Sequence, residues 1–260
     1  MIILISPAKS LDFESPAPTD EASLPVFLGD ETAQLADILK GKSASDLGRL
    51  MSLSEKLTEL NYQRYQHYQT PLDPAASKQA VFSFTGDVYQ GLDAGSLKES
   101  EILALQKKLR ILSGFYGLLK PLDRILPYRL EMGTKLGNER GSNLYQFWGS
   151  RITLQLQGES PNWILNLASN EYFKAVKLKE LQAPVITPIF KDEKKGQYKV
   201  ISFLAKRARG LMTRWVIQEG IEEVEQLSRF SLEGYQYSPQ DSTIVAPLFI
   251  RSESARSLKG

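Results

Sequence analysis

The sequence predicts a mixed α/β fold, in which a single compact domain over residues 1–260 has helices flanking a mixed central sheet. Three observations lead to this prediction. Strand-like apolar runs are distributed among helical patterns along the whole chain, as is typical of mixed α/β domains. A chain of 260 residues with 42% hydrophobic residues can bury a large core. No internal repeat, low-complexity tract or linker divides it.

The N-terminal part begins with a strand and continues with helices. Ile2 to Ile5 form an apolar run that ends at Ser6 and Pro7, because proline cannot join a strand ladder. The segment 15–29 is rich in Pro, Ser and Asp and predicts an irregular surface excursion. Three helical patterns follow it, over residues 30–40, 43–51 and 52–68.

The rest of the chain alternates between strands and helices. We expect strands over residues 80–85, 163–167, 184–190, 198–204 and 243–250. The charged, glycine-containing segment 191–197 would join two of them as a hairpin. Helices are expected over residues 99–108 and 205–219, and Gly220 is a plausible stop for the second.

The composition excludes several classes of protein and site. There is no cysteine, so disulfides, thiolate ligands, iron–sulfur clusters and cysteine nucleophiles are excluded, and the one histidine, His67, leaves no multi-histidine metal centre. No apolar run is long enough for a membrane span, and the N-terminus lacks the pattern of a secretory signal. We therefore expect a cytoplasmic monomer without a bound metal or cofactor and without membrane contact.

The net charge of +2 conceals an uneven distribution. Residues 161–215 contain eleven Lys and Arg against four Asp and Glu, whereas residues 1–60 contain five against ten. The middle of the chain is basic and both ends are acidic. This asymmetry indicates an anionic partner for the central region, without distinguishing DNA from RNA, nucleotide or acidic protein.

The first basic element is the stretch Leu109 to Arg129, where two glycines bracket an aromatic pair and cations crowd both flanks. A helix over 99–112, a glycine turn whose N–H groups face a phosphate, and a second helix opened by Pro121 would grip a nucleic-acid backbone. The candidate DNA-binding residues here are Arg110, Ser113, Gly114, Tyr116, Gly117, Lys120 and Arg124. The alternative is a tight turn with solvated cations, and residues 109–113 fit a strand equally well.

The second basic element is the predicted helix over residues 205–219, whose apolar stripe is flanked by cations. Its candidate DNA-binding residues are Lys206, Arg207, Arg209 and Arg214. A solvated amphipathic helix is the alternative interpretation. Two basic elements in one chain favour nucleic-acid binding.

Polar residues follow two of the predicted strands, and a charged pair lies between them in sequence. These residues make a candidate polar or anion pocket, because sites in α/β proteins form where strands end. They are Ser6, Lys9, Arg129, Glu131, Asn166, Ser169 and Glu171. Turn chemistry at the first strand and a helix cap at the second are the alternatives.

Eight ordered blocks of the chain resemble the YaaA family of bacterial peroxide stress proteins, nearly end to end. The blocks are ISPAK (5–9), GDVY (86–89), LSGFYG (112–117), PYRLEMG (127–133), LYQFWG (144–149), NLASNEYF (166–173), AKRARG (205–210) and EGY (233–235). The resemblance implies a YaaA-type α/β fold with a positively charged cleft, a helix-hairpin-helix-like element and binding to DNA. It also implies a role in limiting iron-driven oxidative damage during hydroperoxide stress.

We therefore expect a DNA-binding protein of the peroxide stress response, which holds the phosphate backbone of duplex or structured DNA largely independently of sequence. The rival hypothesis is an enzyme that acts on a nucleotide, nucleobase or nucleic-acid end in the polar pocket. A protein-interaction module that uses the acidic ends is a third possibility, supported by the charge imbalance alone.

Overall fold

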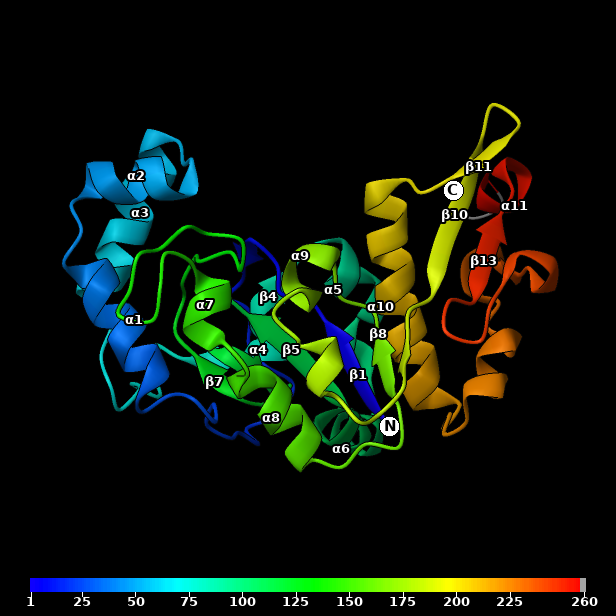
Figure 1. Cartoon of the computed structure of the whole chain (residues 1–260), viewed down its shortest axis with the longest axis horizontal. Coiled ribbons are helices and arrows are strands. Elements are labelled where there is room, and N and C mark those ends of the chain that lie inside the picture. The colour runs from blue at the N-terminus through cyan, green and yellow to red at the C-terminus, as the bar shows by residue number, and fades with distance from the viewer. Residues whose placement is uncertain (258–260) are drawn as a thin grey trace.

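A five-stranded mixed sheet forms the centre of the molecule (Figure 1). The computed structural model describes residues 1–257. The strand order is β6-β5-β1-β8-β9, with β6 antiparallel to β5 and the other neighbours parallel. The strands are β1 (Ile2–Ile5), β5 (Leu109–Ser113), β6 (Gly117–Leu119), β8 (Ile164–Asn166) and β9 (Val185–Ile186). Every residue of β1 and β5 is buried, as expected for central strands covered on both faces.

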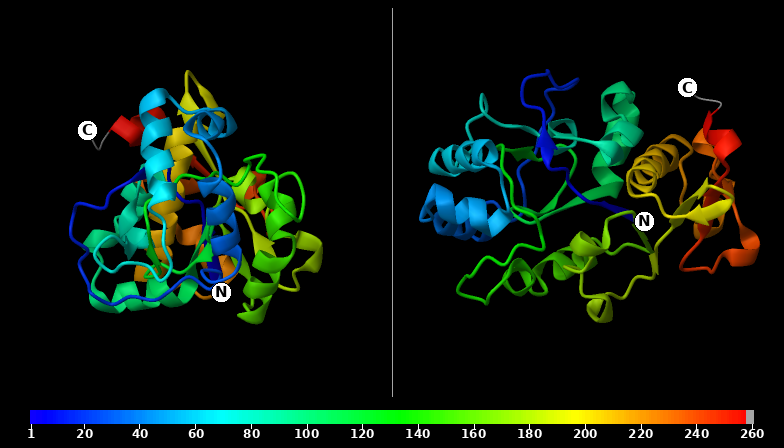
Figure 2. Two further views of the ribbon diagram at one scale, coloured as in Figure 1. Left: turned by 90° about the vertical axis from the view of Figure 1, so that its left-hand side faces the viewer. Right: turned by 90° about the horizontal axis from the view of Figure 1, so that it is seen from above.

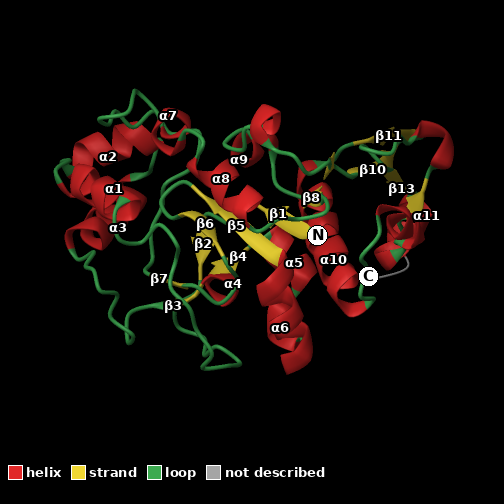
Figure 3. Cartoon of the chain, turned by 60° about the horizontal axis from the view of Figure 1, so that its bottom comes forward, coloured by secondary structure: helices red, strands yellow, loops and turns green. Residues whose placement is uncertain are grey.

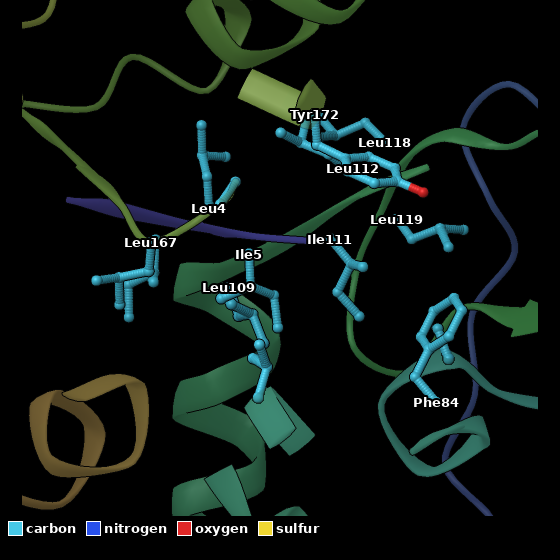
Figure 4. Packing of buried hydrophobic residues seen from close by; sticks show 14 of the residues in the cluster. Leu4, Ile5, Phe84, Leu109, Ile111, Leu112, Leu118, Leu119, Leu167 and Tyr172 are labelled. Atoms are coloured by element: carbon cyan, nitrogen blue, oxygen red, sulfur yellow. The ribbon is translucent and has the colours of Figure 1, made fainter. Parts of the chain in front are cut away.

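Helices cover both faces of this sheet (Figure 3). One face carries α7 (Leu144–Trp148), α8 (Arg151–Gly158) and α9 (Asn170–Phe173). The other carries α4 (Ala80–Ser83), α5 (Asp87–Leu92) and α6 (Glu99–Lys108). Leu4 and Leu112 point toward α9 and Tyr172, whereas Ile5, Leu109 and Ile111 point to the opposite side (Figure 4). This alternation of side chains places hydrophobic core on both sides of the strands.

A group of three helices closes one end of the molecule and a second sheet closes the other (Figures 1 and 2). The helices are α1 (Glu31–Lys40), α2 (Ala44–Met51) and α3 (Glu55–Gln66). The second sheet has the order β11-β10-β13-β12, with β10 (Ile189–Lys194), β11 (Gln197–Lys199), β12 (Gln236–Tyr237) and β13 (Leu248–Arg251). The long helix α10 (Ser202–Gln218) lies between this sheet and the central one. The last helix is α11 (Glu253–Ser257).

The remaining regular elements are short. Two-stranded pairs join β2 (Ser10–Leu11) to β4 (Phe84–Thr85) and β3 (Lys78–Gln79) to β7 (Arg124–Ile125). Short 3-10 helices cover Ala94–Ser96, Leu178–Glu180, Val224–Arg229, Leu232–Gly234 and Pro239–Asp241. No helix within residues 1–257 combines the length and the apolar character that crossing a bilayer requires.

The backbones of α5 and α10 cross in direct contact, which two glycines make possible. A Cβ on Gly91 would lie 2.2 Å from the Arg207 carbonyl oxygen, and one on Gly210 would lie 1.8 Å from the Val88 carbonyl oxygen. Any larger side chain at either position would force the two helices apart. The crossing therefore fixes where the side chains of α10 lie relative to the central sheet.

The mixed α/β class, the strand at residues 2–5 and the flanking helices are confirmed. The predicted strand over 80–85 is wrong in its first part, because 80–83 forms the helical turn α4. The hairpin forms, but its first strand β10 extends to Lys194 and only Lys195 and Gly196 make the turn. The predicted strand over 198–204 is wrong after Lys199, because helix α10 already begins at Ser202. The predicted strand over 184–190 is divided between β9 in the central sheet and β10 in the second sheet. The last strand begins at Leu248 rather than Thr243.

The helix-hairpin-helix-like element that we expected over residues 99–129 does not form. Residues 109–113 form strand β5, which pairs with β1 on one side and with β6 on the other. No helix begins at Pro121; residues 120–123 form a turn in which the buried Asp123 carboxylate accepts a bond from the Lys120 N–H, 2.7 Å away. The apolar side chains of Leu109, Ile111 and Leu112 are buried, and the segment pairs with β1 and β6. Burial and pairing therefore favour a strand at 109–113 over a continuation of helix α6.

We expect Gly210→Ala to destabilise the protein by at least about 1–3 kcal/mol, because the new methyl group collides with the backbone of α5. Chemical denaturation followed by circular dichroism would measure the change. Gly158→Ala in α8 is the matched control, since nothing lies within 4 Å of its Cβ position. Equal stability of the two variants would contradict the direct contact between α5 and α10.

Candidate functional site

A pocket of about 260 Å³ opens where the parallel strands β1 and β8 end. The loop after β1, the start of α5, the loop before α9 and the N-terminal half of α10 form its walls. Its lining residues are Ser6, Pro7, Ala8, Lys9, Ser10, Thr85, Gly86, Asp87, Val88, Tyr89, Glu131, Leu167, Ser169, Glu171, Tyr172, Lys206 and Arg209. Neighbouring parallel strands bring polar residues together at their carboxyl edge, where α/β proteins commonly bind ligands.

Two serines join the ends of β1 and β8. The Ser169 backbone N–H donates to the Ser6 hydroxyl at 2.9 Å, and the Ser6 hydroxyl lies 3.3 Å from that of Ser169. The Tyr89 hydroxyl, from α5, donates to the Ser6 carbonyl at 3.1 Å. These bonds hold the loop after β1 against both α5 and the loop before α9.

Glu131 links two cations at one side of the pocket. One carboxylate oxygen lies 3.0 Å from the Lys9 ammonium nitrogen, and the other accepts a bond from Arg129 at 3.1 Å. The Lys9 side chain is 62% exposed, whereas that of Arg129 is only 16% exposed. Arg129 therefore supports Glu131 from behind, and Lys9 stays at the mouth of the pocket.

Helix α9 contributes a second carboxylate and a buried phenol. Glu171 accepts a bond from the Gly133 backbone N–H at 2.9 Å, which fixes the 131–134 turn beside α9. Burial raises the pKa of Tyr172, and nearby Tyr128 and Glu171 add to that rise. Burial raises the pKa of Tyr89 in the same way. Both phenols stay protonated at neutral pH and keep their donor capacity.

The opposite wall contains one carboxylate and two cations. The side chain of Asp87, in the first turn of α5, makes no hydrogen bond or close ion pair with another residue of the part that the structure describes. Its charge does act on Arg207, whose pKa is raised mainly by the bond to Glu233 and further by Asp87. Lys206 and Arg209, one turn apart on α10, also lack an ion-pair partner among residues 1–257. The pocket thus carries both charge signs, with three acidic side chains and three basic ones in its lining.

The structure brings together most of the predicted pocket residues. Ser6, Lys9, Glu131, Ser169 and Glu171 line one cavity although they come from three separate regions of the chain. Arg129 does not line the cavity but forms an ion pair with Glu131, which does. Asn166 is buried beneath it and bonds to the Ala168 N–H and the Thr187 hydroxyl, so it supports the loop instead of lining the pocket.

The glycine turn of the first basic element, residues 113–117, is buried in the core. We had expected it to be exposed and to face a phosphate, and that prediction is wrong. Ser113, Tyr116 and Gly117 are buried, and a Cβ on Gly114 would lie 2.3 Å from the Leu130 carbonyl oxygen. The Ser113 hydroxyl accepts the N–H groups of Phe115 and Tyr116. These N–H groups are satisfied inside the protein and do not face a phosphate.

Most of the predicted DNA-binding cations have partners within the protein. Arg110 is buried against Glu159, and Arg207 makes a two-pronged pair with Glu233. Arg214 binds the Asp93 region and Arg124 binds the carbonyls of Pro74 and Ser77. Lys120 is exposed and lines a different pocket, beside Arg110 and Glu159. Of the predicted cations of both basic elements, Lys206 and Arg209 alone line the pocket at the strand ends.

Sequence reasoning assigned no role to Asp87, Tyr89 or Tyr172, although all three line the pocket. Asp87 and Tyr89 belong to the segment Gly86-Asp87-Val88-Tyr89, which forms one of the blocks of family resemblance. This block of family resemblance was the feature of the sequence that could have pointed to Asp87 and Tyr89. Among residues 1–257, no group of three or more His, Asp or Glu side chains is placed to hold a metal ion.

Comparisons with known proteins agree on one family. The family model described as peroxide stress protein YaaA matches residues 1–241. A UPF0246 protein of Marinomonas sp. is 54% identical over 261 residues, covering 100% of both chains. UPF0246 proteins of Shewanella piezotolerans and Aliivibrio fischeri are 52% and 51% identical over 257 residues, covering 97% of this chain and 100% and 99% of theirs.

We expect Arg207→Ala to lower the free energy of unfolding by about 1–2 kcal/mol, because charge-assisted bonds to the mostly buried Glu233 are lost. Lys206→Ala, one residue away but exposed and unpaired within the described chain, should change it by less than about 0.5 kcal/mol. Urea denaturation of both variants tests this. Equal losses would mean that the Arg207 pair contributes nothing beyond an ordinary surface residue.

Proposed function

The chain belongs to the peroxide stress protein YaaA family, and from this membership we propose that it serves the peroxide stress response through the pocket at the strand ends. The pocket takes a nucleotide, a nucleobase or the end of a nucleic-acid strand and acts on it. One observation carries this proposal. Hydroxyl groups, carboxylates and cations from the loop after β1, from α5, α9 and α10, and from the 131–134 turn converge on one small cavity.

The lining suits a ligand with a flat apolar face and polar edges. Val88 and Leu167 are apolar, and Tyr89 and Tyr172 offer aromatic surface. The carboxylates of Asp87, Glu131 and Glu171 can accept bonds from the amino and imino groups of a base. A nucleobase presents this combination of a stacking face and edge donors.

Acid–base chemistry is available at the same place. The Asp87 side chain makes no hydrogen bond or close ion pair within the described part of the chain, and Glu171 uses one oxygen for the Gly133 N–H. A carboxylate within hydrogen-bond reach of a bound ligand can accept or return a proton. We assign the general acid–base role to these two residues, and the positioning of the loop to the Ser6–Ser169 bond.

A binding experiment tests this proposal. We expect the protein to bind nucleosides or nucleotides, and Asp87→Asn to weaken binding by about tenfold or more, since a charge-assisted hydrogen bond contributes about 1.5–3 kcal/mol. Isothermal titration calorimetry against the four deoxynucleosides and their 5′-monophosphates would measure it. Asp20→Asn, at an exposed site outside the pocket, is the control and should bind like the unmodified protein. Absence of binding to every compound would overturn the proposal.

Duplex DNA binding is a second candidate function, supported by a different surface. Lys194, Lys195 and Lys199 are exposed on the β10–β11 hairpin, which projects from the molecule beside α10 (Figure 1). Their side chains make no ion pair with another described residue, and Lys206 lies on the adjacent helix α10. Protection of DNA from iron-driven damage would then come from covering the DNA, since one histidine and no cysteine make the chain a poor iron buffer.

The salt dependence of DNA binding tests the hairpin. Each lost phosphate contact should reduce the slope of log affinity against log salt by about 0.9 on duplex DNA. We therefore expect Lys194, Lys195 and Lys199, all changed to Ala, to flatten the slope in fluorescence anisotropy titrations. A matched triple change of the exposed Lys56, Lys107 and Lys135 removes the same charge elsewhere. Equal slopes for the two triple variants would reject the hairpin as the DNA contact.

A further inference from the structure

The cations of helix α10 divide into two functional groups. Arg207 and Arg214 are held by Glu233 and by the Asp93 region, so their charges are used inside the protein. Lys206 and Arg209 make no side-chain hydrogen bond or ion pair with any residue of the described chain. Both of these unpaired side chains line the pocket.

Of these two residues, Arg209 gives the stronger indication of an anionic ligand. It lies partly buried at the α5–α10 crossing, next to Gly210. Burial lowers the pKa of its guanidinium group, which nevertheless stays charged because arginine titrates far above neutral pH. A partly buried charge without a carboxylate partner is costly unless something else neutralises it. An anionic group of a ligand would supply that counter-charge.

The rest of the lining limits what kind of anion can enter. Asp87 and Glu171 would repel a molecule that is negative throughout. The charge of Glu131, in contrast, is balanced by Lys9 and Arg129. The ligand must therefore be negative at one end, against Lys206 and Arg209, and must offer hydrogen-bond donors at the other. The pocket volume of about 260 Å³ lies just below the range of ordinary ligand sites, about 300–1,000 Å³, so the pocket suits no more than one nucleotide unit.

We infer that Lys206 and Arg209 form a phosphate-binding subsite, and that the ligand is a phosphomonoester on a single nucleoside unit. This inference rests on the proposed function of the pocket. The guanidinium fork of Arg209 can bind two phosphate oxygens at once, and Lys206 adds a point charge at the exposed side. A free nucleoside monophosphate and the phosphorylated end of a strand share this chemistry.

The test compares ligands with and without the phosphate. We expect the unmodified protein to bind a deoxynucleoside 5′-monophosphate at least about tenfold more tightly than the deoxynucleoside, because bonds between charged partners are the strong ones. The double variant Lys206→Met, Arg209→Met should lose this preference and keep the affinity for the nucleoside. The variant Arg209→Lys should keep part of it. The double variant Lys56→Met, Lys107→Met removes the same charge outside the pocket and should keep the full preference.

The outcomes separate this inference from the proposed function. Equal affinity for nucleoside and monophosphate, or a preference that survives in the Lys206, Arg209 variant, would overturn the phosphate subsite and leave the pocket's function standing. Binding of neither compound would overturn both. Thermal unfolding shows whether Arg209→Met is folded, and the exposed Lys206→Met serves as a second variant. Short oligonucleotides with a 5′-phosphate or a 5′-hydroxyl decide whether the phosphate belongs to a strand end or to a free nucleotide.

Discussion

The direct contact between α5 and α10 is the constraint on which the arrangement of the molecule depends. Gly91 and Gly210 let the backbones of these helices touch, and no larger side chain fits at either place. Helix α5 follows β4 and packs on one face of the central sheet (Figure 3). Its contact with α10 places Lys206 and Arg209 in the same pocket as the residues that follow β1. The second sheet packs on the far side of α10, so its position depends on the same contact.

This constraint explains how one helix can serve both stability and the binding that we propose. Two cations of α10 use their charge internally, Arg207 with Glu233 and Arg214 with the Asp93 region at the end of α5. Those one turn apart on the pocket side, Lys206 and Arg209, keep their charge available. A helix that is pressed against α5 cannot rotate to exchange these roles. The distribution of free and paired cations is thus a property of the fold as much as of the sequence.

Sequence reasoning predicted the part of the site that depends on local pattern. The apolar run Ile2 to Ile5 and the polar residues after it identified both the strand and the end at which the pocket opens. The pattern could not show that Arg110 would be buried, because its partner Glu159 lies 49 residues away. The stretch Leu109 to Ser113 was ambiguous for the same reason, since its conformation is decided by pairing with β1, more than a hundred residues earlier. Long-range pairing, not composition, separates structural cations from available ones.

The balance of charges in the pocket also bears on how the protein meets nucleic acid. A continuous phosphate backbone needs an uninterrupted positive surface, and the carboxylates of Asp87, Glu131 and Glu171 interrupt it at the pocket. A single nucleotide unit avoids this conflict, because its base can face the carboxylates while its phosphate faces Lys206 and Arg209. If both proposals hold, a longer strand would leave the pocket toward the exposed lysines of the β10–β11 hairpin, beside α10. The small pocket and the basic hairpin would then be compatible parts of the nucleic-acid surface that we propose.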